Sequence, residues 1–462
     1  SLESWRAYNY PHVTAVYWSL YRLGRRFRPA RVRRHGWRWY LQRAHGTAMG
    51  MWEHGGEVFP HEQQRVAGQA WSKVGNGQGT AQWGLMVGSI FESLLRDLLL
   101  EGWAKEAAEL QQVMERRVHR WLSMPFPYGS EFAWDNTGHE EIATWLLAYG
   151  HDAQAAQTAD AVSAYTSLSP HWAYCGSARR WWDFAINGDA RPKYNGNERV
   201  LHHYAGALNS VVLFDRALVA REDVWLWRLA SCAAGGPLTT IRPSSGAASM
   251  GWHGDPAKLR RDDLSADWGL GLYGHWRNAG AYLVCDREVG EWLCLSCDVV
   301  STSAPPGARC DAAGKEAQVE IAPRDAFRRR VYLQPLGLLM TVDGGAFERV
   351  SLTVGCAAGG EAVLRLSPLP SSSTHALLTL TADGPRGGGR GRRVHCRCVA
   401  RSCSLGAAPF PSRGGAPGEA GSLQESPFEL SFAPGGKLSE PPLARVALAV
   451  EAAGEAEGVR LK

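Results

Sequence analysis

Apolar residues in the first half of the chain recur at spacings of three and four residues, the period of an amphipathic α-helix. The segment LMVGSIFESLLRDLLLEGW, residues 85–103, is the clearest case. Short polar or glycine-bearing connectors separate the segments, so we expect consecutive helices to pack as antiparallel hairpins. The pattern predicts helices near residues 12–27, 37–54, 80–101, 103–122, 138–150, 152–166, 202–219 and 221–234.

From about residue 281 the period of the pattern changes to two. Short alternating runs such as KEAQVEIAP (315–323), FERVSLTVG (347–355) and HALLTLTADG (375–384) are separated by Gly, Pro and Asp turns. This pattern is typical of an antiparallel β-sandwich. The predicted fold class is therefore α+β multidomain. We expect a helical domain at 1–235, a glycine- and aspartate-rich bridge at 236–280 that contributes to a cleft, and a β-sandwich domain at 281–462.

Residues 384–426 interrupt the strand pattern with a high density of Gly, Pro, Ser and Arg. Such a composition buries too little apolar surface to offset the entropy of ordering, so we interpret this stretch as mostly a flexible insertion between strands. Arginine–glycine tracts also occur in RNA-binding tails. One short tract is a weak basis for that function.

Charge and composition narrow the classes of function. The 462 residues carry a net charge of only +5, and the basic excess is almost wholly arginine. The arginines of residues 25–34 lie in no recognised nucleic-acid module, so no nucleic-acid partner is expected. No apolar stretch approaches the length of a membrane span. The chain opens at Ser1 directly into an aromatic segment, which suggests that an upstream segment precedes it. The 20 tryptophans suit a core or stacking against sugar rings.

The ten cysteines are irregularly spaced and too sparse for a disulfide scaffold. Cys294 and Cys297 form a CxxC pair inside a run that has the pattern of a strand, and no second CxxC accompanies it, so a zinc site is not expected. We interpret the thiols as structural or incidental. The acidic stretch Asp262–Asp267 could bind calcium, but an ordinary solvated loop is favoured. No cofactor and no metal are predicted.

The densest polar and aromatic cluster is PFPYGSEFAWDNTGHEEIATW, residues 125–145. Part of it fits a helix start near 138, with Asp135 or Thr137 as the cap and acidic residues in the first turn. Paired carboxylates among aromatic residues also suit glycosidic hydrolysis, in which one acid protonates the leaving oxygen and the other activates water or attacks the sugar. The leading acid/base candidates are Asp135 and either Glu140 or Glu141, with Glu131 in reserve.

Further aromatic, basic and amide residues cluster in SPHWAYCGSARRWWDFAINGD (169–189), LHHYAGALNS (201–210) and GLYGHWRNAG (271–280). Tryptophans are candidate sugar platforms, and Arg179 or Arg180 is a candidate to bind an acidic sugar. Core packing is the alternative interpretation for the tryptophan and arginine neighbours. The predicted substrate-binding residues are Tyr128, Trp134, His139, His171, Trp172, Tyr174, Arg179, Arg180, Trp181, Trp182, His203, Tyr204, Asn209, His275, Arg277 and Asn278.

These motifs, together with YNYPHVTAVYWSLYRL (8–23), resemble a family of large microbial proteins classed as a domain of unknown function with a six-hairpin, α/α-toroid glycosidase-like domain. The resemblance covers roughly residues 1–350 and implies a carbohydrate substrate, without assigning catalytic residues. It also implies a toroid that is incomplete at its N-terminus, because a complete ring of this type has more helices than the pattern predicts here. The 384–440 region has no counterpart in the resemblance.

Three hypotheses for function follow. The first is a glycoside hydrolase that cleaves a polysaccharide or oligosaccharide, and secretion is inferred from that substrate class alone. The second is a polysaccharide lyase, which neutralises a uronate carboxylate and abstracts the C5 proton. The third is a non-catalytic glycan-binding or scaffold protein, whose sugar binding would survive Asp135→Asn combined with Glu140→Gln. The residues available to a lyase are His171, Tyr174, Arg179, His203, Tyr204 and Asn209.

Overall fold

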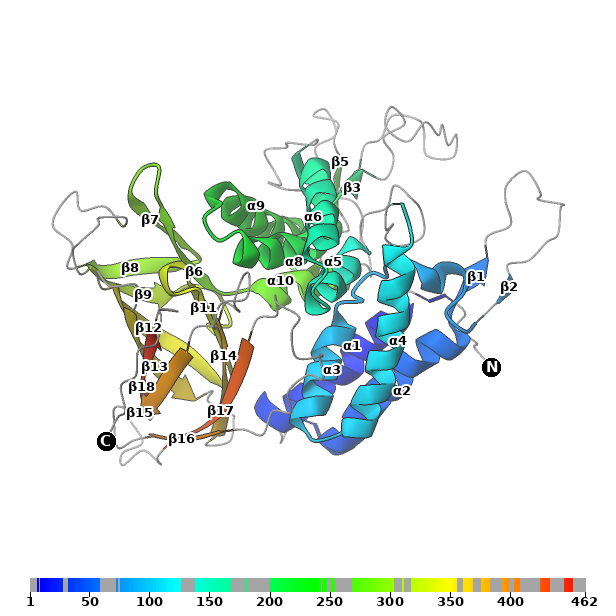
Figure 1. The fold of residues 1–462 in the computed structure, drawn as a ribbon, viewed down its shortest axis with the longest axis horizontal. Coiled ribbons are helices and arrows are strands. Elements are labelled where there is room, and N and C mark those ends of the chain that lie inside the picture. The colour runs from blue at the N-terminus through cyan, green and yellow to red at the C-terminus, as the bar shows by residue number, and fades with distance from the viewer. Residues whose placement is uncertain are drawn as a thin grey trace, which may run out of the picture. The chain divides into compact units, whose positions relative to one another are not determined.

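The computed structural model of the chain divides into two compact units. The helical unit comprises Ser1–Arg22 and Val32–Asn278, and the sheet unit comprises Leu23–Arg31 and Ala279–Lys462. Figure 1 labels the elements of both units. The structure describes residues 6–7, 9–27, 32–58, 72–73, 75–125, 138–167, 179–180, 200–241, 243–246, 251–253, 268–302, 310, 317–354, 360–368, 375–382, 393–398, 403–407, 424–432 and 444–451.

The helical unit is built from α-helices with two small sheets of short strands. The two-stranded sheet pairs β1 (Glu57–Val58) with β2 (Ser72–Lys73), and the three-stranded sheet has the order β3 (Arg179–Arg180), β4 (Val200–His202), β5 (Gly251–His253). The predicted helical character of the first half is confirmed. Its described helices are α1 (Asn9–Arg22), α2 (Trp37–His54), α3 (Ile90–Leu100), α4 (Ala104–Leu122), α5 (His139–Ala148), α6 (Asp152–Ser167), α8 (His203–Val219), α9 (Val224–Gly235) and α10 (Trp268–Asn278).

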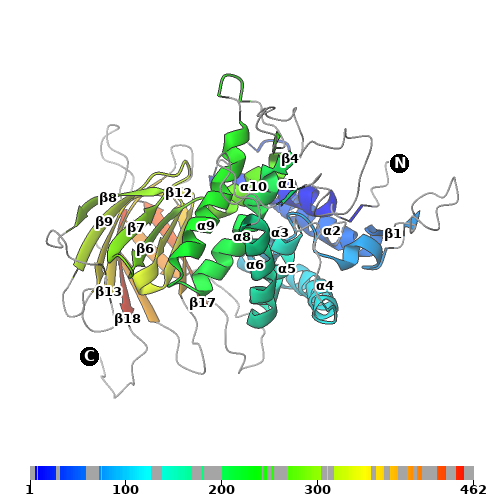
Figure 2. The same ribbon diagram turned by 90° about the horizontal axis from the view of Figure 1, so that it is seen from above.

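One hydrophobic core joins α1, α2, α3, α4 and α5 of the helical unit, because each of these helices buries an apolar stripe. Trp18, Phe91, Trp121 and Trp145 are among its buried side chains. Helix α8 packs against α5, α6, α9 and α10, and Figure 2 shows these helices side by side. The core therefore accounts for part of the tryptophan content that also suits sugar binding.

Helix α10 lies within the stretch interpreted from the sequence as a bridge. Its sequence, WGLGLYGHWRN, contains glycines that disfavour an isolated helix. Gly274 explains why the helix nevertheless forms: a Cβ at this position would lie 2.2 Å from the carbonyl oxygen of Ala207 in α8. The missing side chain permits close packing of α10 on α8, so tertiary contact outweighs the low helix propensity.

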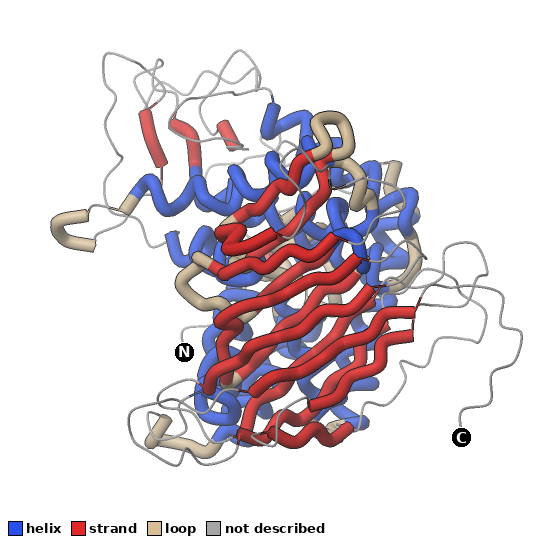
Figure 3. The backbone as a smooth tube through the Cα atoms, turned by 90° about the vertical axis from the view of Figure 1, so that its left-hand side faces the viewer, coloured by secondary structure: helices blue, strands red, loops and turns tan. Residues whose placement is uncertain are grey.

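The sheet unit contains two sheets, seen as red tubes in Figure 3. All strand pairs are antiparallel except β6 with β10, which are parallel. The seven-stranded sheet has the order β16 (Cys403–Ala407), β17 (Gln424–Phe432), β14 (His375–Ala382), β11 (Leu338–Asp343), β10 (Arg330–Leu333), β6 (Ala281–Asp286), β7 (Glu291–Leu295). The six-stranded sheet has the order β15 (Arg393–Cys398), β18 (Ala444–Glu451), β13 (Gly360–Pro368), β12 (Gly345–Val354), β9 (Ala317–Pro323), β8 (Cys297–Thr302).

Both sheets contribute to a single hydrophobic core. Leu338 and Met340 of β11 belong to the seven-stranded sheet, and Val350 and Leu352 of β12 belong to the six-stranded sheet. Alternate residues of each strand point to the same face, so the period of two in the sequence supplies this core. The prediction that the second half of the chain forms mainly antiparallel sheets is confirmed.

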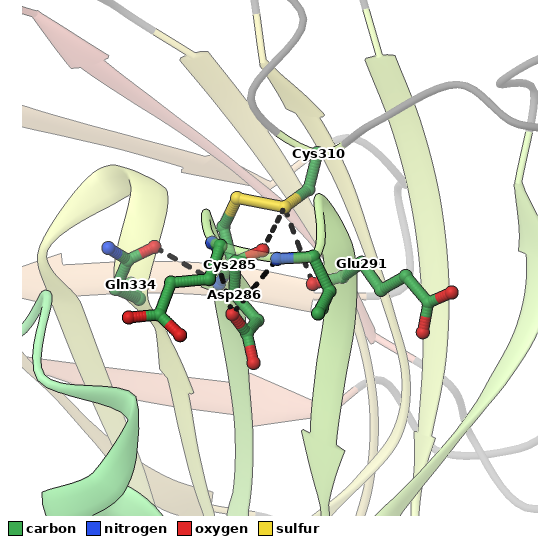
Figure 4. The surroundings of a disulfide bond; sticks show 7 residues. Cys285, Asp286, Glu291, Cys310 and Gln334 are labelled. Atoms are coloured by element: carbon green, nitrogen blue, oxygen red, sulfur yellow. Dashed lines mark hydrogen bonds between the residues drawn. A yellow bond between two sulfur atoms is a disulfide. The ribbon is translucent and has the colours of Figure 1, made fainter.

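Two disulfides stabilise the start of the sheet unit. Cys285, in β6, is bonded to Cys310, whose backbone amide donates a hydrogen bond to the carbonyl of Gly290. Figure 4 shows this bond beside Asp286, Glu291 and Gln334. The second disulfide, Cys294–Cys297, spans the corner at which the chain passes from β7 in one sheet to β8 in the other. Among the described residues these four cysteines are therefore structural, and the CxxC pair forms one of the two disulfides.

The arginine- and glycine-rich stretch at 384–426 contains the edge strands β15 and β16 and the start of β17, which lies between β16 and β14. The sequence predicts mostly flexible chain here. The strands form because their neighbours β18 and β17 supply hydrogen-bonding partners, which composition does not reveal. The remaining residues of this stretch lie outside the described part of the chain.

Candidate active site

The first turn of α5 carries His139, Glu140 and Glu141, and all three residues are buried. The two glutamates have no solvent exposure at all, 0% each. Acidic residues in the first turn of a helix usually remain in water, where they complement the helix dipole. These two carboxyl groups instead enter the interior of the helical unit, so their partners there decide what they can do.

Glu140 accepts a hydrogen bond from the backbone amide of Ser89, with N–O distances of 3.2 and 3.4 Å to its two carboxyl oxygens. Burial raises the pKa of Glu140 to about 8, although the hydrogen bond from Ser89 and the charge of Arg277 act in the opposite direction. The neighbouring Glu141 raises this pKa further. Glu140 is therefore largely protonated at neutral pH, the state required of a general acid.

Helix α10 brings two more polar groups to Glu140. The hydroxyl of Tyr273 lies 2.8 Å from the Ser89 hydroxyl, and burial raises the pKa of Tyr273. Arg277 donates a hydrogen bond to the Ser93 hydroxyl at 3.0 Å and forms an ion pair with Glu92 at 3.8 Å. The cluster is thus held by α3, α5 and α10 together.

Arg277 is the positive charge of this cluster. Burial lowers its pKa, but Tyr273, Asp215, Glu92 and Glu140 outweigh that effect and raise it. Arg277 consequently remains charged in the protein interior. A cation with 15% of its side chain exposed, beside a protonated carboxyl and a tyrosine hydroxyl, is able to stabilise developing negative charge or to bind a carboxylate.

Glu141 has a different environment from its neighbour. Its Oε2 atom lies 2.5 Å from Nη2 of Arg117 and accepts a hydrogen bond from the amide of Leu85 at 2.7 Å. Arg117 also donates to the carbonyl oxygens of Ala81 and Trp83. Burial raises the pKa of Glu141, while Arg117 and Leu85 oppose that shift. We therefore assign Glu141 to positioning the loop before α3, whereas Glu140 is the candidate for chemistry.

The loop before α3 approaches α5 closely at two glycines. A Cβ at Gly88 would lie 2.3 Å from the carboxyl carbon of Glu141, and one at Gly84 would lie 2.3 Å from the carbonyl oxygen of Gly138. Between them, Val87 has a φ of +65°, which is a strained conformation for a β-branched residue. Strained backbone occurs at functional sites, where surrounding contacts maintain it. This strain lies two residues before Ser89, the hydrogen-bond partner of Glu140.

Several other predicted residues are described but occupy different environments. His275 Nδ1 lies 2.9 Å from the carbonyl oxygen of Ala234, and the amide of Asn278 donates to Gly274 and Ser210. Asn209 is completely buried, and neither polar atom of its side-chain amide has a hydrogen-bond partner among the described residues. Among the predicted residues whose side chains the structure describes, only Glu140 and Arg277 contribute to the cluster around Ser89.

The side chains of the remaining predicted residues lie outside the part of the chain that the structure describes. Arg179 and Arg180 form β3, and His203 and Tyr204 begin α8, but their side chains are outside the description. The acidic stretch at 262–267 is also outside the described residues. The other candidates outside the described residues are Tyr128, Glu131, Trp134, Asp135, His171, Trp172, Tyr174, Trp181 and Trp182.

The sequence did not single out Ser89, Tyr273, Glu92 or Asp215 as site residues. A signal was present in the close glycines Gly84 and Gly88 before Ser89, since glycine often marks close approach of two backbones. Nothing in the sequence connects Ser89 with Tyr273, which is 184 residues further along the chain. Across the described ranges, no helix is long and apolar enough to cross a membrane, and no group of three or more His, Cys, Asp or Glu side chains is arranged to hold a metal ion.

The fold and the site define an α+β protein whose helical unit holds a buried, protonated carboxyl beside an arginine and a tyrosine. The chain belongs to the family of unknown function DUF5695, which it matches over residues 1–385. No curated protein matches it. Among solved structures the chain is similar to heparinase III with methylated lysines, at 7% identity and a TM-score of 0.23, covering 89% of this chain and 73% of that chain. A likeness at this TM-score bears on neither the fold nor the chemistry.

Proposed function

We propose that this protein is a carbohydrate-active enzyme, a glycoside hydrolase acting on a polysaccharide or oligosaccharide, with Glu140 as its general acid. The observation that carries the proposal is the burial of Glu140, which raises its pKa to about 8. A glycosidase acid must hold its proton at the working pH, and burial of a carboxyl is the usual means.

The second carboxylate of the reaction is assigned to Asp135, with Glu131 in reserve. Asp135 precedes Glu140 by five residues, and its carboxylate would activate water or attack the sugar. Glu140 has no exposed surface in the structure. The proposal therefore requires that substrate binding expose its carboxyl to the glycosidic oxygen.

The proposed architecture is an α/α toroid formed by helical hairpins at 1–235, completed at the site by the 236–280 bridge, and a β-sandwich at 281–462. The packing of consecutive helices against each other, α1 with α2 and α8 with α9, supports the hairpin arrangement. Tyr273 and Arg277, both from the bridge, support its contribution to the site. Two sheets around one core support the sandwich. The two disulfides support an oxidising compartment and hence secretion.

A polysaccharide lyase is the second candidate, favoured by one specific observation. Asn209 is buried with an amide that has no partner among the described residues, and such an amide suits recognition of a uronate carboxylate. The group that removes the C5 proton would then be one of the predicted candidates His171, Tyr174, His203 and Tyr204.

The test is an assay of the purified chain on neutral and acidic polysaccharides, following new reducing ends and near-ultraviolet absorbance. Hydrolysis predicts reducing ends without absorbance, and Glu140→Gln should reduce the rate by about 10²–10⁴. Glu222→Gln, an exposed residue before α9, is the matched control and should retain full activity.

Each other outcome of the assay rejects the hydrolase proposal. Absorbance from an unsaturated product would identify a lyase instead. Sugar binding without any product, unchanged in Asp135→Asn combined with Glu140→Gln, would identify a non-catalytic glycan-binding protein.

A further inference from the structure

The sheet unit has a groove of its own, independent of the cluster around Glu140. It is lined by residues of β8, β9 and β12 and of the turn after β9. Three of the lining residues are Arg324, Arg328 and Arg349, and two are Asp298 and Glu348. The groove therefore holds more positive than negative charge.

Each acid in the groove is already paired. Arg324 forms an ion pair with Asp298, and Arg328 forms one with Glu348 at 2.8 Å. The other carboxyl oxygen of Glu348 accepts a hydrogen bond from Ser367. Neither acid is left to neutralise Arg349.

Arg349 has no ion-pair partner among the described residues, and its Nη1 atom is buried without a hydrogen bond. A β-bulge between Phe347 and Arg349 places Glu348 as an extra residue in β12. Bulges commonly redirect side chains toward functional surfaces. The bulge therefore explains how two consecutive charged residues both line the groove.

A second observation comes from the register of the sheet. Arg349 of β12 lies directly opposite Arg365 of β13, which is exposed, and Arg365 lies opposite Arg445 of β18. Like charges directly opposite each other on neighbouring strands destabilise a sheet. Two arginines directly opposite each other, Arg349 and Arg365, are an arrangement that a bound anion would stabilise.

Apolar surface accompanies these charges. Val299 and Val300 of β8 line the same groove and expose 41% and 45% of their surface. A ligand with anionic groups on a ring that also has C–H faces matches this surface better than an inorganic anion does. None of the groove's lining residues is aromatic, whereas single-stranded nucleic acids are bound largely by stacking on aromatic rings.

We propose that this groove and the adjoining Arg365, which we call the arginine row, bind the carboxylate or sulfate groups of an acidic polysaccharide. The choice of a glycan rests on the proposed function of the helical unit, whereas the preference for an anion rests on the arginine row itself. Guanidinium groups bind both kinds of oxyanion in a bidentate manner, so the shared chemistry is that of a polyanionic sugar chain.

The test is calorimetric binding of the whole chain to a sulfated heparin oligosaccharide, an oligogalacturonate, a neutral malto-oligosaccharide and a single-stranded oligothymidylate. The key variant is Arg349→Glu, which replaces a like-charge pair with an attractive pair opposite Arg365. Its melting temperature should therefore be no lower than that of the parent protein. Its affinity for at least one acidic oligosaccharide should fall by about tenfold or more.

The matched control is Arg34→Gln combined with Arg228→Gln, which removes the same net charge from two exposed positions in the helical unit. Loss of binding to the sulfated probe, the uronate probe or both in Arg349→Glu alone would support the proposal and identify the anion. Unchanged affinity in Arg349→Glu, or an equal loss in the control, would overturn it. If the chain bound the oligothymidylate more tightly than the oligosaccharides, and Arg349→Glu abolished that binding, the arginine row would be assigned to nucleic acid instead.

This test is separate from the test of hydrolysis. Binding at the arginine row requires no turnover, and Arg349 belongs to the sheet unit whereas Glu140 belongs to the helical unit. A chain without hydrolytic activity that still binds acidic oligosaccharides through Arg349 would reject the hydrolase and retain the arginine row.

Discussion

Arg117 of α4 and Glu141 of α5 form an ion pair at 2.5 Å, with 1% and 0% of their side chains exposed. Arg117 also caps the carbonyls of Ala81 and Trp83, so one guanidinium ties the loop before α3 to two helices. A buried ion pair contributes little net stability compared with apolar residues, but removal of one partner leaves an uncompensated charge. The pair therefore fixes the loop that presents Ser89 to Glu140.

The first prediction concerns this ion pair. Arg117→Met should lower the free energy of unfolding by about 3–5 kcal/mol, because Glu141 is left buried without its cation. Urea denaturation followed by tryptophan fluorescence measures the change. The neighbouring exposed Arg116→Met should change it by about 0.5 kcal/mol or less. Equal effects of the two variants would show that the ion pair does not organise the loop.

The second prediction concerns pH. Glu140 has a pKa of about 8 in the folded protein and an ordinary value of 4.5. Between these values the folded state holds a proton that the unfolded state has lost, so stability falls as the pH rises and levels off above about pH 8. The partly buried His12, whose pKa burial lowers from 6.5 to about 4, acts in the opposite direction below pH 6.5.

The window from pH 6.5 to 8 therefore isolates the carboxyl. The free energy of unfolding should fall there by about 2 kcal/mol. Glu140→Gln should weaken this slope, since an amide does not titrate. Urea midpoints at a series of pH values provide the measurement, and an identical slope in the variant would mean that Glu140 is ionised throughout.

The third prediction concerns the close approach at Gly88. Gly88→Ala should destabilise the helical unit by about 1–3 kcal/mol, because the added Cβ would lie 2.3 Å from the carboxyl carbon of Glu141. Gly46→Ala is the matched control in α2, where a Cβ meets nothing within 4 Å. That control should stabilise the protein by about 0.5–1 kcal/mol, since alanine favours a helix. Thermal unfolding of both variants distinguishes steric conflict from a general effect of alanine.

The fourth prediction concerns the disulfide between Cys285 and Cys310, which closes a loop with a sequence separation of 25 residues. Replacement of both cysteines by alanine should cost about 3–4 kcal/mol, chiefly because the unfolded chain gains freedom. Cys232→Ala, outside both disulfides, should cost less. Denaturation under non-reducing conditions is the readout. An unchanged midpoint in the double variant would mean that the loop is already ordered without the bond.

The local spacing of apolar residues was sufficient to predict most of the longer helices and strands. Helix α2 spans Trp37–His54, the same range that the apolar spacing predicts, and β9 and β14 lie within the predicted alternating runs at 315–323 and 375–384. These elements follow from side-chain periods of 3.6 and 2, which any short segment displays. Helix α10 was not predicted because its glycines are favourable only when packed against α8.

The sequence predicted some residues of the site but not how they are grouped. The sequence placed Glu140 and Glu141 at the start of a helix as equal candidates, since both residues share the same local pattern. Their separation into a protonated carboxyl beside Ser89 and an ion-paired carboxyl beside Arg117 depends on which neighbour each one meets in the interior. Those neighbours lie 51 and 24 residues away along the chain.

The sequence by itself therefore determined most of the helices of the first half, the change from helix to sheet near residue 281, and the acidic and aromatic segments that carry the candidate chemistry. Only the tertiary structure decided which carboxyl holds its proton, which arginine lies beside it, which cysteines are joined, and which arginines face one another across the sheet. The physical reason is range: helix and strand periods act within a few residues, whereas burial, pKa and charge pairing depend on groups that only folding brings together.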